Sequence, residues 1–80
     1  MNSKAIRWQS RRGMKELDLF LLPFFDAKFD LLDNYSKNAY LSLLDEADPD
    51  IYNWLMSYSQ PENSSLQNIV KKIREFRLSE

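Results

Sequence analysis

The stretch GMKELDLFLLPFFDAKFDLL, residues 13–32, decides the fold because it is apolar on almost every side of a helix. Its large apolar residues recur at intervals of three and four, which is the spacing of an α-helix rather than the alternation of a β-strand. A helix that is apolar nearly all round belongs in the centre of a fold, running here from Met14 to about Leu32. Pro23 lacks a backbone donor and crowds the preceding turn, so we expect a kink or short break near residues 19–22.

The segments on both sides of this central helix also have helical spacing. A short first helix would begin with Ser3 as its cap and end at Gly13, the only glycine of the chain. A third helix would begin with Ser36 as its cap. The inward faces expected for the third, fourth and fifth helices are Tyr40, Leu43, Leu44 and Ala47; Ile51, Trp54, Leu55 and Tyr58; and Leu66, Ile69, Val70, Ile73 and Phe76. Because the loops are short, we predict an all-α, compact single domain, residues 1–80, built as a bundle of five short helices with antiparallel neighbours.

Two of the helices have strong start signals. In DPDIYNWLM, residues 48–56, Asp48 would be the N-cap and Pro49 the first helical residue. Farther along, Ser64 and Gln67 have the spacing of a capping box. Both signals place a helix start directly before a run of apolar residues.

The composition excludes most catalytic and metal-binding classes. The chain has no cysteine and no histidine, and its single glycine cannot build a phosphate-binding loop. The acidic cluster of Asp45, Glu46, Asp48 and Asp50 lacks the glycine and the closing glutamate of a calcium loop, which favours a solvated loop with a helix cap. We therefore predict no catalytic residue, no metal site and no cofactor bound by this chain, which would not be an enzyme.

Charge is distributed unevenly along the chain although the net charge is only −1. Residues 1–15 carry five basic and no acidic side chains, residues 16–50 carry nine acidic and two basic ones, and residues 51–80 carry four basic and three acidic ones. Such polarity favours an oriented encounter with a charged surface. The longest apolar run, Leu19 to Phe25, is far shorter than the roughly 20 residues of a membrane span, and no signal peptide is visible. We expect a cytoplasmic protein without membrane insertion.

The junction RGMKE, residues 12–16, combines features that helix chemistry explains with features that it does not. Gly13 would end one helix, and Glu16 would bond back to a free N–H at the start of the next. Arg11 and Arg12 are not required there, because cations are unfavourable near the positive end of a helix. Charges held against local preference are candidates for pairing with an external carboxylate.

We therefore predict a partner-binding surface at the basic start of the chain, with Trp8 serving as a core or interface anchor. Its residues are Arg7, Trp8, Arg11, Arg12, Gly13 and Glu16. Two other binding roles use the same surface. A small helical regulatory protein could bind nucleic acid there, although the pI near 5.4 and the acidic middle of the chain argue against it, or the surface could neutralise a toxin.

At these residues the sequence resembles the FAD assembly factors of succinate dehydrogenase, the SdhE-type family with mitochondrial relatives. That family shows an R-G-x-x-E motif, which reads here as Arg12, Gly13, Met14, Lys15 and Glu16. The motif continues into an E-L-D-L-x-L-x-P-F-F-like stretch at residues 16–25, and DPDIYNWLM is a second match. The resemblance covers nearly the whole chain.

The resemblance implies a five-helix bundle that binds the flavoprotein subunit of succinate dehydrogenase, and often that of fumarate reductase. Such a chaperone promotes covalent attachment of FAD to a histidine of the partner, which holds the FAD itself. The copy would be bacterial and would act as a monomer. On this hypothesis Gly13 allows close approach of the partner's backbone, Glu16 accepts hydrogen bonds from it, and Arg12 pairs with one of its carboxylates.

Overall fold

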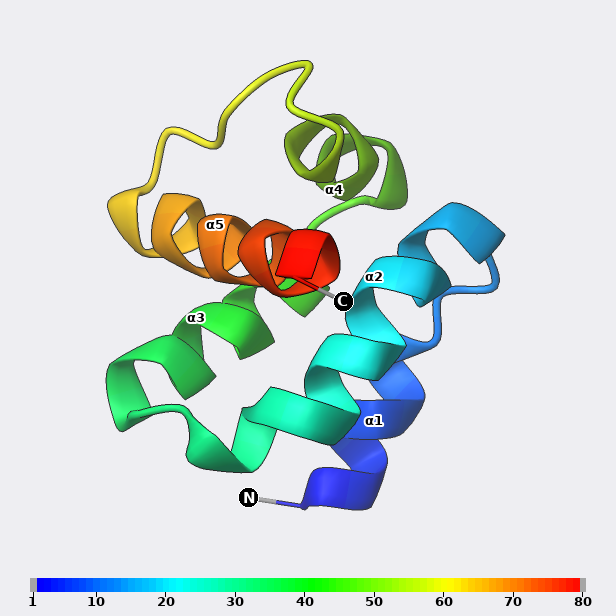
Figure 1. Cartoon of the computed structure of the whole chain (residues 1–80), viewed down its shortest axis with the longest axis vertical. Helices are drawn as coiled ribbons and strands as arrows, with labels where there is room; N and C mark the ends of the chain where they lie inside the picture. The colour runs from blue at the N-terminus through cyan, green and yellow to red at the C-terminus, as the bar shows by residue number, and fades with distance from the viewer. Residues whose placement is uncertain (1, 80) are drawn as a thin grey trace.

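The computed structural model describes residues 2–79, and its all-helical architecture confirms the predicted fold class. The elements are α1 (Ser3–Ser10), α2 (Lys15–Lys28), the 3-10 turn η1 (Phe29–Leu31), α3 (Asn34–Leu44), α4 (Asp48–Leu55) and α5 (Ser64–Ser79) (Figure 1). No residue in the range 2–79 lies in a strand. The described chain measures 31 × 26 × 26 Å and surrounds one hydrophobic core.

Helix α2 is the central element, as its apolar sequence predicted. It packs against α1, α4 and α5, and it runs in the opposite direction to α1 (Figure 1). The residues that it buries in the core are Leu17, Leu21, Phe24 and Phe25. Of the predicted kink or short break before Pro23, the break is wrong, because α2 is continuous from Lys15 to Lys28, and the kink stays a prediction. Packing on several sides holds a helix that lacks one backbone donor. The α-helix also ends earlier than predicted, and η1 completes the segment.

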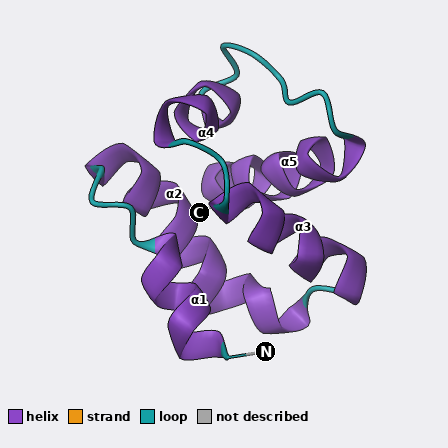
Figure 2. Cartoon of the chain, turned by 180° about the vertical axis from the view of Figure 1, so that it is seen from behind, coloured by secondary structure: helices purple, strands orange, loops and turns teal. Residues whose placement is uncertain are grey.

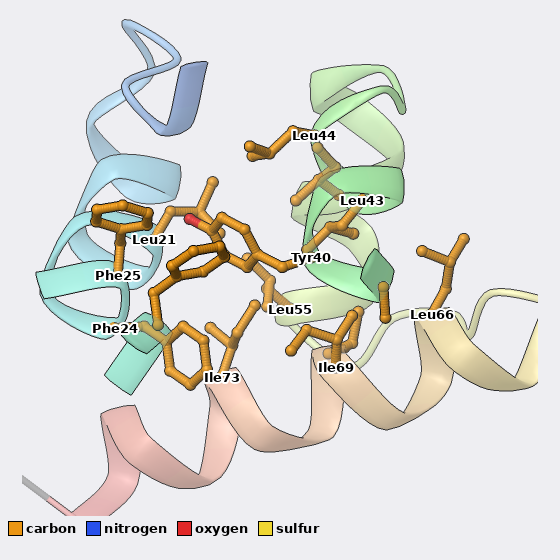
Figure 3. Packing of buried hydrophobic residues seen from close by; sticks show 14 of the residues in the cluster. Leu21, Phe24, Phe25, Tyr40, Leu43, Leu44, Leu55, Leu66, Ile69 and Ile73 are labelled. Carbon is orange, nitrogen blue, oxygen red and sulfur yellow. The ribbon is translucent and has the colours of Figure 1, made fainter. Parts of the chain in front are cut away.

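The core is rich in aromatic side chains that surround Tyr40 of α3. Phe25 and Phe29 stack with ring centroids 4.8 Å apart, and the ring of Phe29 meets that of Tyr40 at 5.5 Å. Figure 3 shows Tyr40 reaching from α3 toward Phe24 and Phe25 of α2. Large rings of this kind bury much area each and therefore let an 80-residue chain form a core without disulfides.

The hydroxyl of Tyr40 is buried but not unpaired. It lies 2.6 Å from Oγ of Ser10, at the end of α1, and Ser10 donates its own proton to the carbonyl of Ile6 at 2.9 Å. A serine hydroxyl has one proton, so Tyr40 is the donor to Ser10. Burial raises the pKa of Tyr40 to about 12. This contact joins α1 to α3 through the interior of the bundle.

The first and third helices are capped by residues other than those predicted. The side chain of Asn2, not Ser3, accepts hydrogen bonds at the start of α1, from the N–H groups of Lys4 and Ala5. Asp33 caps α3 by accepting from the N–H of Ser36 at 2.8 Å, and this bond lowers the pKa of Asp33. In both cases a neighbouring Asn or Asp provides an equally good acceptor and takes the cap position.

The predicted capping box of α5 is wrong for a similar reason. Asn63 accepts hydrogen bonds from the N–H groups of Ser65 and Leu66 and thereby takes the role assigned to Ser64. The amide of Gln67 donates to the carbonyl of Pro61 at 2.7 Å instead of closing a box. The end of the loop that leads into α5 is thus held by the side chains of Asn63 and Gln67.

The predicted inward faces are correct except at two positions. Ala47 is exposed because it is the residue that caps α4. Tyr58 is exposed because α4 ends at Leu55 and the chain then turns at Ser57, which has a positive φ of 65°. None of the helices within residues 2–79 combines the length and the apolar character required for crossing a membrane.

Candidate partner-binding site

The loop between α1 and α2 is extended and open at its glycine. Helix α1 ends at Ser10 and not at Gly13, because Arg11 already has extended backbone angles. Gly13 has a φ of +80°, which side chains with a Cβ rarely adopt. A Cβ added at Gly13 would meet no atom of residues 2–79 within 4 Å, apart from those of its two neighbours in the chain. Crowding inside the bundle therefore does not explain this glycine, which leaves its backbone conformation and the open space outside the loop as explanations.

Arg12 is bound by its own chain at the position just before this glycine. Its Nε donates to Oδ1 of Asp48 at 2.8 Å, and its side chain is only 17% exposed. Its two terminal nitrogens donate to backbone carbonyls, which belong to Gln9 at 3.2 Å, Leu44 at 2.9 Å and Glu46 at 3.2 Å. The sequence-based hypothesis assigned this guanidinium to a partner's carboxylate, and in the structure Asp48 occupies that place.

The surroundings of Arg12 explain why a cation is held at this junction. Gln9 lies in the last turn of α1 and Leu44 is the last residue of α3, and carbonyls at helix C-termini lack partners within the helix. A positive charge is favourable at that end of a helix dipole. The guanidinium of Arg12 therefore binds carbonyls at the C-termini of α1 and α3. In the sequence, however, Arg12 lies just before the N-terminus of α2, where a cation is unfavourable.

Asp48 is the counterion of Arg12 and not the cap of α4. The N-cap of α4 is Ala47, and Asp48 is the first helical residue, with Pro49 following it. The predicted capping role of Asp48 is wrong because its carboxylate, 35% exposed, binds the guanidinium instead. Within residues 2–79 no group of three or more acidic side chains is arranged to hold a metal ion.

The two acids in the first turn of α2 have different surroundings. The backbone N–H of Arg12 donates to Oδ1 of Asp18 at 2.8 Å, so Asp18 makes the return bond that was predicted for Glu16. Glu16 is exposed, is the second residue of α2, and makes no side-chain hydrogen bond or ion pair with any residue in the range 2–79. Its carboxylate faces solvent at the positive end of the helix dipole, where a negative charge is favourable.

Arg7 and Asp26 form the second ion pair of the described chain. Nε and Nη2 of Arg7 donate to the two carboxylate oxygens at 2.8 and 3.0 Å, which joins α1 to α2. The hydrogen bond from Arg7 holds the pKa of Asp26 below its usual value. Both side chains remain about half exposed, so the pair is accessible to a partner from outside.

Trp8 and Arg11 lie on the surface next to this loop. Trp8 is 74% exposed, so the prediction that it could be a core residue is wrong, and its role as an interface anchor stays a prediction. Arg11 is exposed and makes no side-chain bond with the rest of residues 2–79. We use the name junction surface for the exposed residues Trp8, Arg11, Gly13 and Glu16, which lie in or beside this loop in the sequence. Figure 2 shows the loop between α1 and α2, which contains Arg11 and Gly13, at one edge of the molecule.

Sequence reasoning missed the residues that hold the junction from inside. Asp48 was assigned to a helix cap in a solvated acidic cluster, no role was predicted for Asp18, and the carbonyls of Leu44 and Glu46 have no signature in a sequence at all. The only available signal was the apparent misplacement of Arg12 at a helix N-terminus, which pointed to a carboxylate somewhere but not to which one.

Comparison with known proteins is consistent with the resemblance stated above. A family model described as "Sdh5: Flavinator of succinate dehydrogenase" matches residues 4–77. The chain belongs to this family. FAD assembly factor SdhE of Yersinia pestis is 44% identical over 73 residues, which cover 91% of this chain and 83% of that protein.

Other relatives have the same name. The SdhE protein of Coxiella burnetii is 44% identical over 73 residues, covering 91% of this chain and 89% of its own length, and that of Pectobacterium atrosepticum is 40% identical over 73 residues, covering 91% and 83%. These proteins are named as assembly factors and not as enzymes, which confirms the prediction that a member of this family is not an enzyme.

Proposed function

We propose that this flavinator-family chain binds the flavoprotein subunit of succinate dehydrogenase and promotes the covalent attachment of FAD to a histidine of that subunit. The observation that carries the proposal is the junction surface, where an unpaired Glu16 carboxylate follows closely on the open, positive-φ backbone of Gly13. Membership of the family and the names of the SdhE relatives supply the identity of the partner.

The chemistry of the attachment belongs to the flavin and the partner. This chain offers no thiol or imidazole, and its acids are engaged in helix starts and ion pairs or face solvent. A protein without reactive groups accelerates such a step by binding more tightly to the conformation in which the reacting groups meet. Glu16 would accept hydrogen bonds from the partner, and the partner's backbone would approach over Gly13, where no Cβ intervenes.

The exposed cation and ring beside the loop would add orientation and contact area. Arg11 supplies a positive charge free to meet a carboxylate of the partner, and Trp8 supplies a large side chain of the type that dominates interfaces. Arg7 contributes through its exposed pair with Asp26. We include the fumarate reductase flavoprotein as a second client, and we propose that the chain acts as a monomer in the cytoplasm and leaves FAD binding to its partner.

The ion pairs weaken the nucleic-acid alternative. Two of the five cations in residues 1–15, Arg7 and Arg12, are neutralised by Asp26 and Asp48 of the same chain. A phosphate-binding surface needs several free cations, because each neutralised phosphate contributes to affinity. Lys4, Arg11 and Lys15 stay exposed and make no ion pair within residues 2–79, but the same stretch of chain also exposes the Glu16 carboxylate and the indole of Trp8, a combination that suits a protein surface better than a phosphate backbone.

The decisive experiment measures flavinylation of the partner with a variant that leaves the fold intact. Glu16→Gln removes only the charge of an exposed side chain, and we expect covalent flavin in the succinate dehydrogenase flavoprotein, read by in-gel fluorescence, to fall to the level without assembly factor. Glu62→Gln is the matched control, since Glu62 is also an exposed acid close to a helix start but lies in the loop before α5. Circular dichroism verifies that both variants are folded. Normal flavinylation by folded Glu16→Gln would contradict the proposal.

A further inference from the structure

The side chain of Arg12 bridges two parts of the chain that are 36 positions apart in sequence. It starts from the loop between α1 and α2 and ends on the loop between α3 and α4, at the carbonyls of Leu44 and Glu46 and the carboxylate of Asp48. These three acceptors lie within one short segment, residues 44–48. The arrangement therefore ties the loop that contains Gly13 to the loop between α3 and α4.

We propose that Arg12 is a positioning residue and that segment 44–48 belongs to the partner-binding site through it. Arg12 does not touch the partner, and its bonds to Asp48 and to the carbonyls fix the conformation in which the junction surface is presented. The inference rests on the proposed function, since it states how the surface that binds the flavoprotein is held in shape.

The geometry restrains Arg12 at both its backbone and its side chain. Its N–H is bound to Asp18 of α2, and its guanidinium uses Nε and both terminal nitrogens on four acceptors. A guanidinium is a planar fork with fixed donor directions, so several simultaneous bonds leave it one orientation. Gly13 follows directly, and as a glycine it has no side chain to restrain its own backbone. The order of the loop at Gly13 therefore has to come from its neighbour.

Burial separates this role from direct contact with a partner. The Arg12 side chain is 17% exposed and already has a carboxylate at 2.8 Å, so a partner's carboxylate would have to displace Asp48 and also break bonds to carbonyls. Glu16 lacks such bonds and is exposed. A surface that is already ordered before binding loses less conformational entropy on association, which raises affinity without any new contact.

The same ion pair gives a reason for the second stretch that resembles the family. DPDIYNWLM begins with Asp48, and the R-G-x-x-E motif begins with Arg12. The two stretches meet in the structure at these first residues. One of them presents the binding surface and the other holds it in place.

The test compares Asp48→Asn with Asp50→Asn and Arg12→Lys. Asp50→Asn is a matched control, since Asp50 is an exposed acid in the first turn of the same helix. Asp48→Asn keeps the shape of the side chain and an oxygen acceptor but removes the ion pair, and Arg12→Lys keeps the charge but loses the fork. We expect each of the two to weaken binding of the folded chain to the flavoprotein subunit about tenfold, whereas Asp50→Asn binds normally. The double variant Arg12→Lys with Asp48→Asn should bind no more weakly than whichever of the two single variants binds more weakly, because both changes remove the same restraint.

Two measurements make the outcome decisive. If Arg12→Lys weakens binding and folded Asp48→Asn does not, Arg12 acts on the partner and the positioning role is overturned, while a loss with Glu16→Gln still upholds the proposed function. In the free chain, hydrogen exchange of the Arg12 amide, which is bound to Asp18, should become about tenfold faster in Asp48→Asn as the loop loosens. Unchanged exchange overturns the inference whatever the partner does, and Asp48→Asn alone decides the question if Arg12→Lys does not fold.

Discussion

Replacing Gly13 distinguishes the two properties of this position, its backbone angle and the open space outside it. The φ of +80° costs an L-residue about 1–2 kcal/mol in the left-handed region, and a Cβ would meet no atom of residues 2–79 within 4 Å, apart from those of its two neighbours in the chain. The whole cost of Gly13→Ala is therefore backbone strain. A domain with a stability of about 5 kcal/mol would keep about 3 kcal/mol and stay about 99% folded.

We expect Gly13→Ala to lower the unfolding midpoint in urea modestly and to abolish flavinylation of the partner, because the added methyl group occupies the space through which the partner approaches. Gly13→Asn separates the two causes. Asparagine adopts positive φ more readily than alanine, so its strain is smaller while its side chain is larger. If activity depends on close approach of the partner to Gly13, Gly13→Asn will be more stable than Gly13→Ala but equally inactive in the in-gel flavin assay.

A stability-matched control completes this test. Asn63→Ala removes the cap of α5, far along the chain from the junction, and costs about 1 kcal/mol. It should support normal flavinylation in spite of its lower stability. Restored flavinylation with Gly13→Asn would refute the reasoning, since it would show that only the backbone angle of Gly13 matters.

The remaining predictions concern stability. Asn63→Ala should lower the free energy of unfolding by about 1 kcal/mol, whereas Ser64→Ala, at the position that the sequence suggested as cap, should leave the urea midpoint unchanged. Ser10→Ala should lower the free energy of unfolding by about 1–3 kcal/mol, because it leaves the buried hydroxyl of Tyr40 without an acceptor. The double variant Ser10→Ala with Tyr40→Phe should lose less than the sum of the losses of the two single variants. Urea unfolding of all four proteins measures this as a double-mutant cycle. Burial raises the pKa of Tyr40 to about 12, whereas the unfolded state has a value near 10, so the folded state retains this proton more strongly. The resulting stability is present below pH 10, and about 2–3 kcal/mol of it is lost between pH 10 and 12. Urea titrations over that range should show this loss for the unchanged chain and not for Tyr40→Phe.

The fold was predictable wherever the signal lay in local spacing. The apolar face of α5 follows from intervals of three and four residues, and the burial of Leu66, Ile69, Val70 and Ile73 confirmed it. Caps were less predictable, because Asn63 and Ser64 both have side chains that can accept from the first turn. Which of two adjacent candidates does so depends on where the chain leaves the preceding loop, and this depends on tertiary packing. The same limit explains the continuity of α2 at Pro23, since packing outweighs the loss of one hydrogen bond.

The candidate site was predictable only in part, because some of its features depend on neighbouring residues in the sequence and others on contacts between distant parts of the chain. Glu16 and Gly13 could be selected from local features, an acid at a helix start and a glycine between two helices. The partner of Arg12 could not, since Asp48 is 36 positions away and its own neighbourhood fits a helix cap equally well. Local chemistry predicted that Arg12 would pair with a carboxylate, but it wrongly assigned that carboxylate to a partner. It could not indicate that the chain itself supplies it.

The structure divides the motif R-G-x-x-E into an internal and an external half. Arg12 is largely buried and engaged with four acceptors, whereas Glu16, four residues later, is exposed and unpaired among the described residues. If both charged residues of the motif touched the partner, partner binding would not depend on Asp48. Arg12 and Glu16 would then either pair with each other in the free chain or both be unpaired. The proposals above therefore give the arginine the role of holding the loop and the glutamate that of contacting the partner. Substitutions at Arg12 and Asp48 should therefore change how strongly the partner binds and how mobile the free loop is, while substitutions at Glu16 should change binding and leave the free loop as it is.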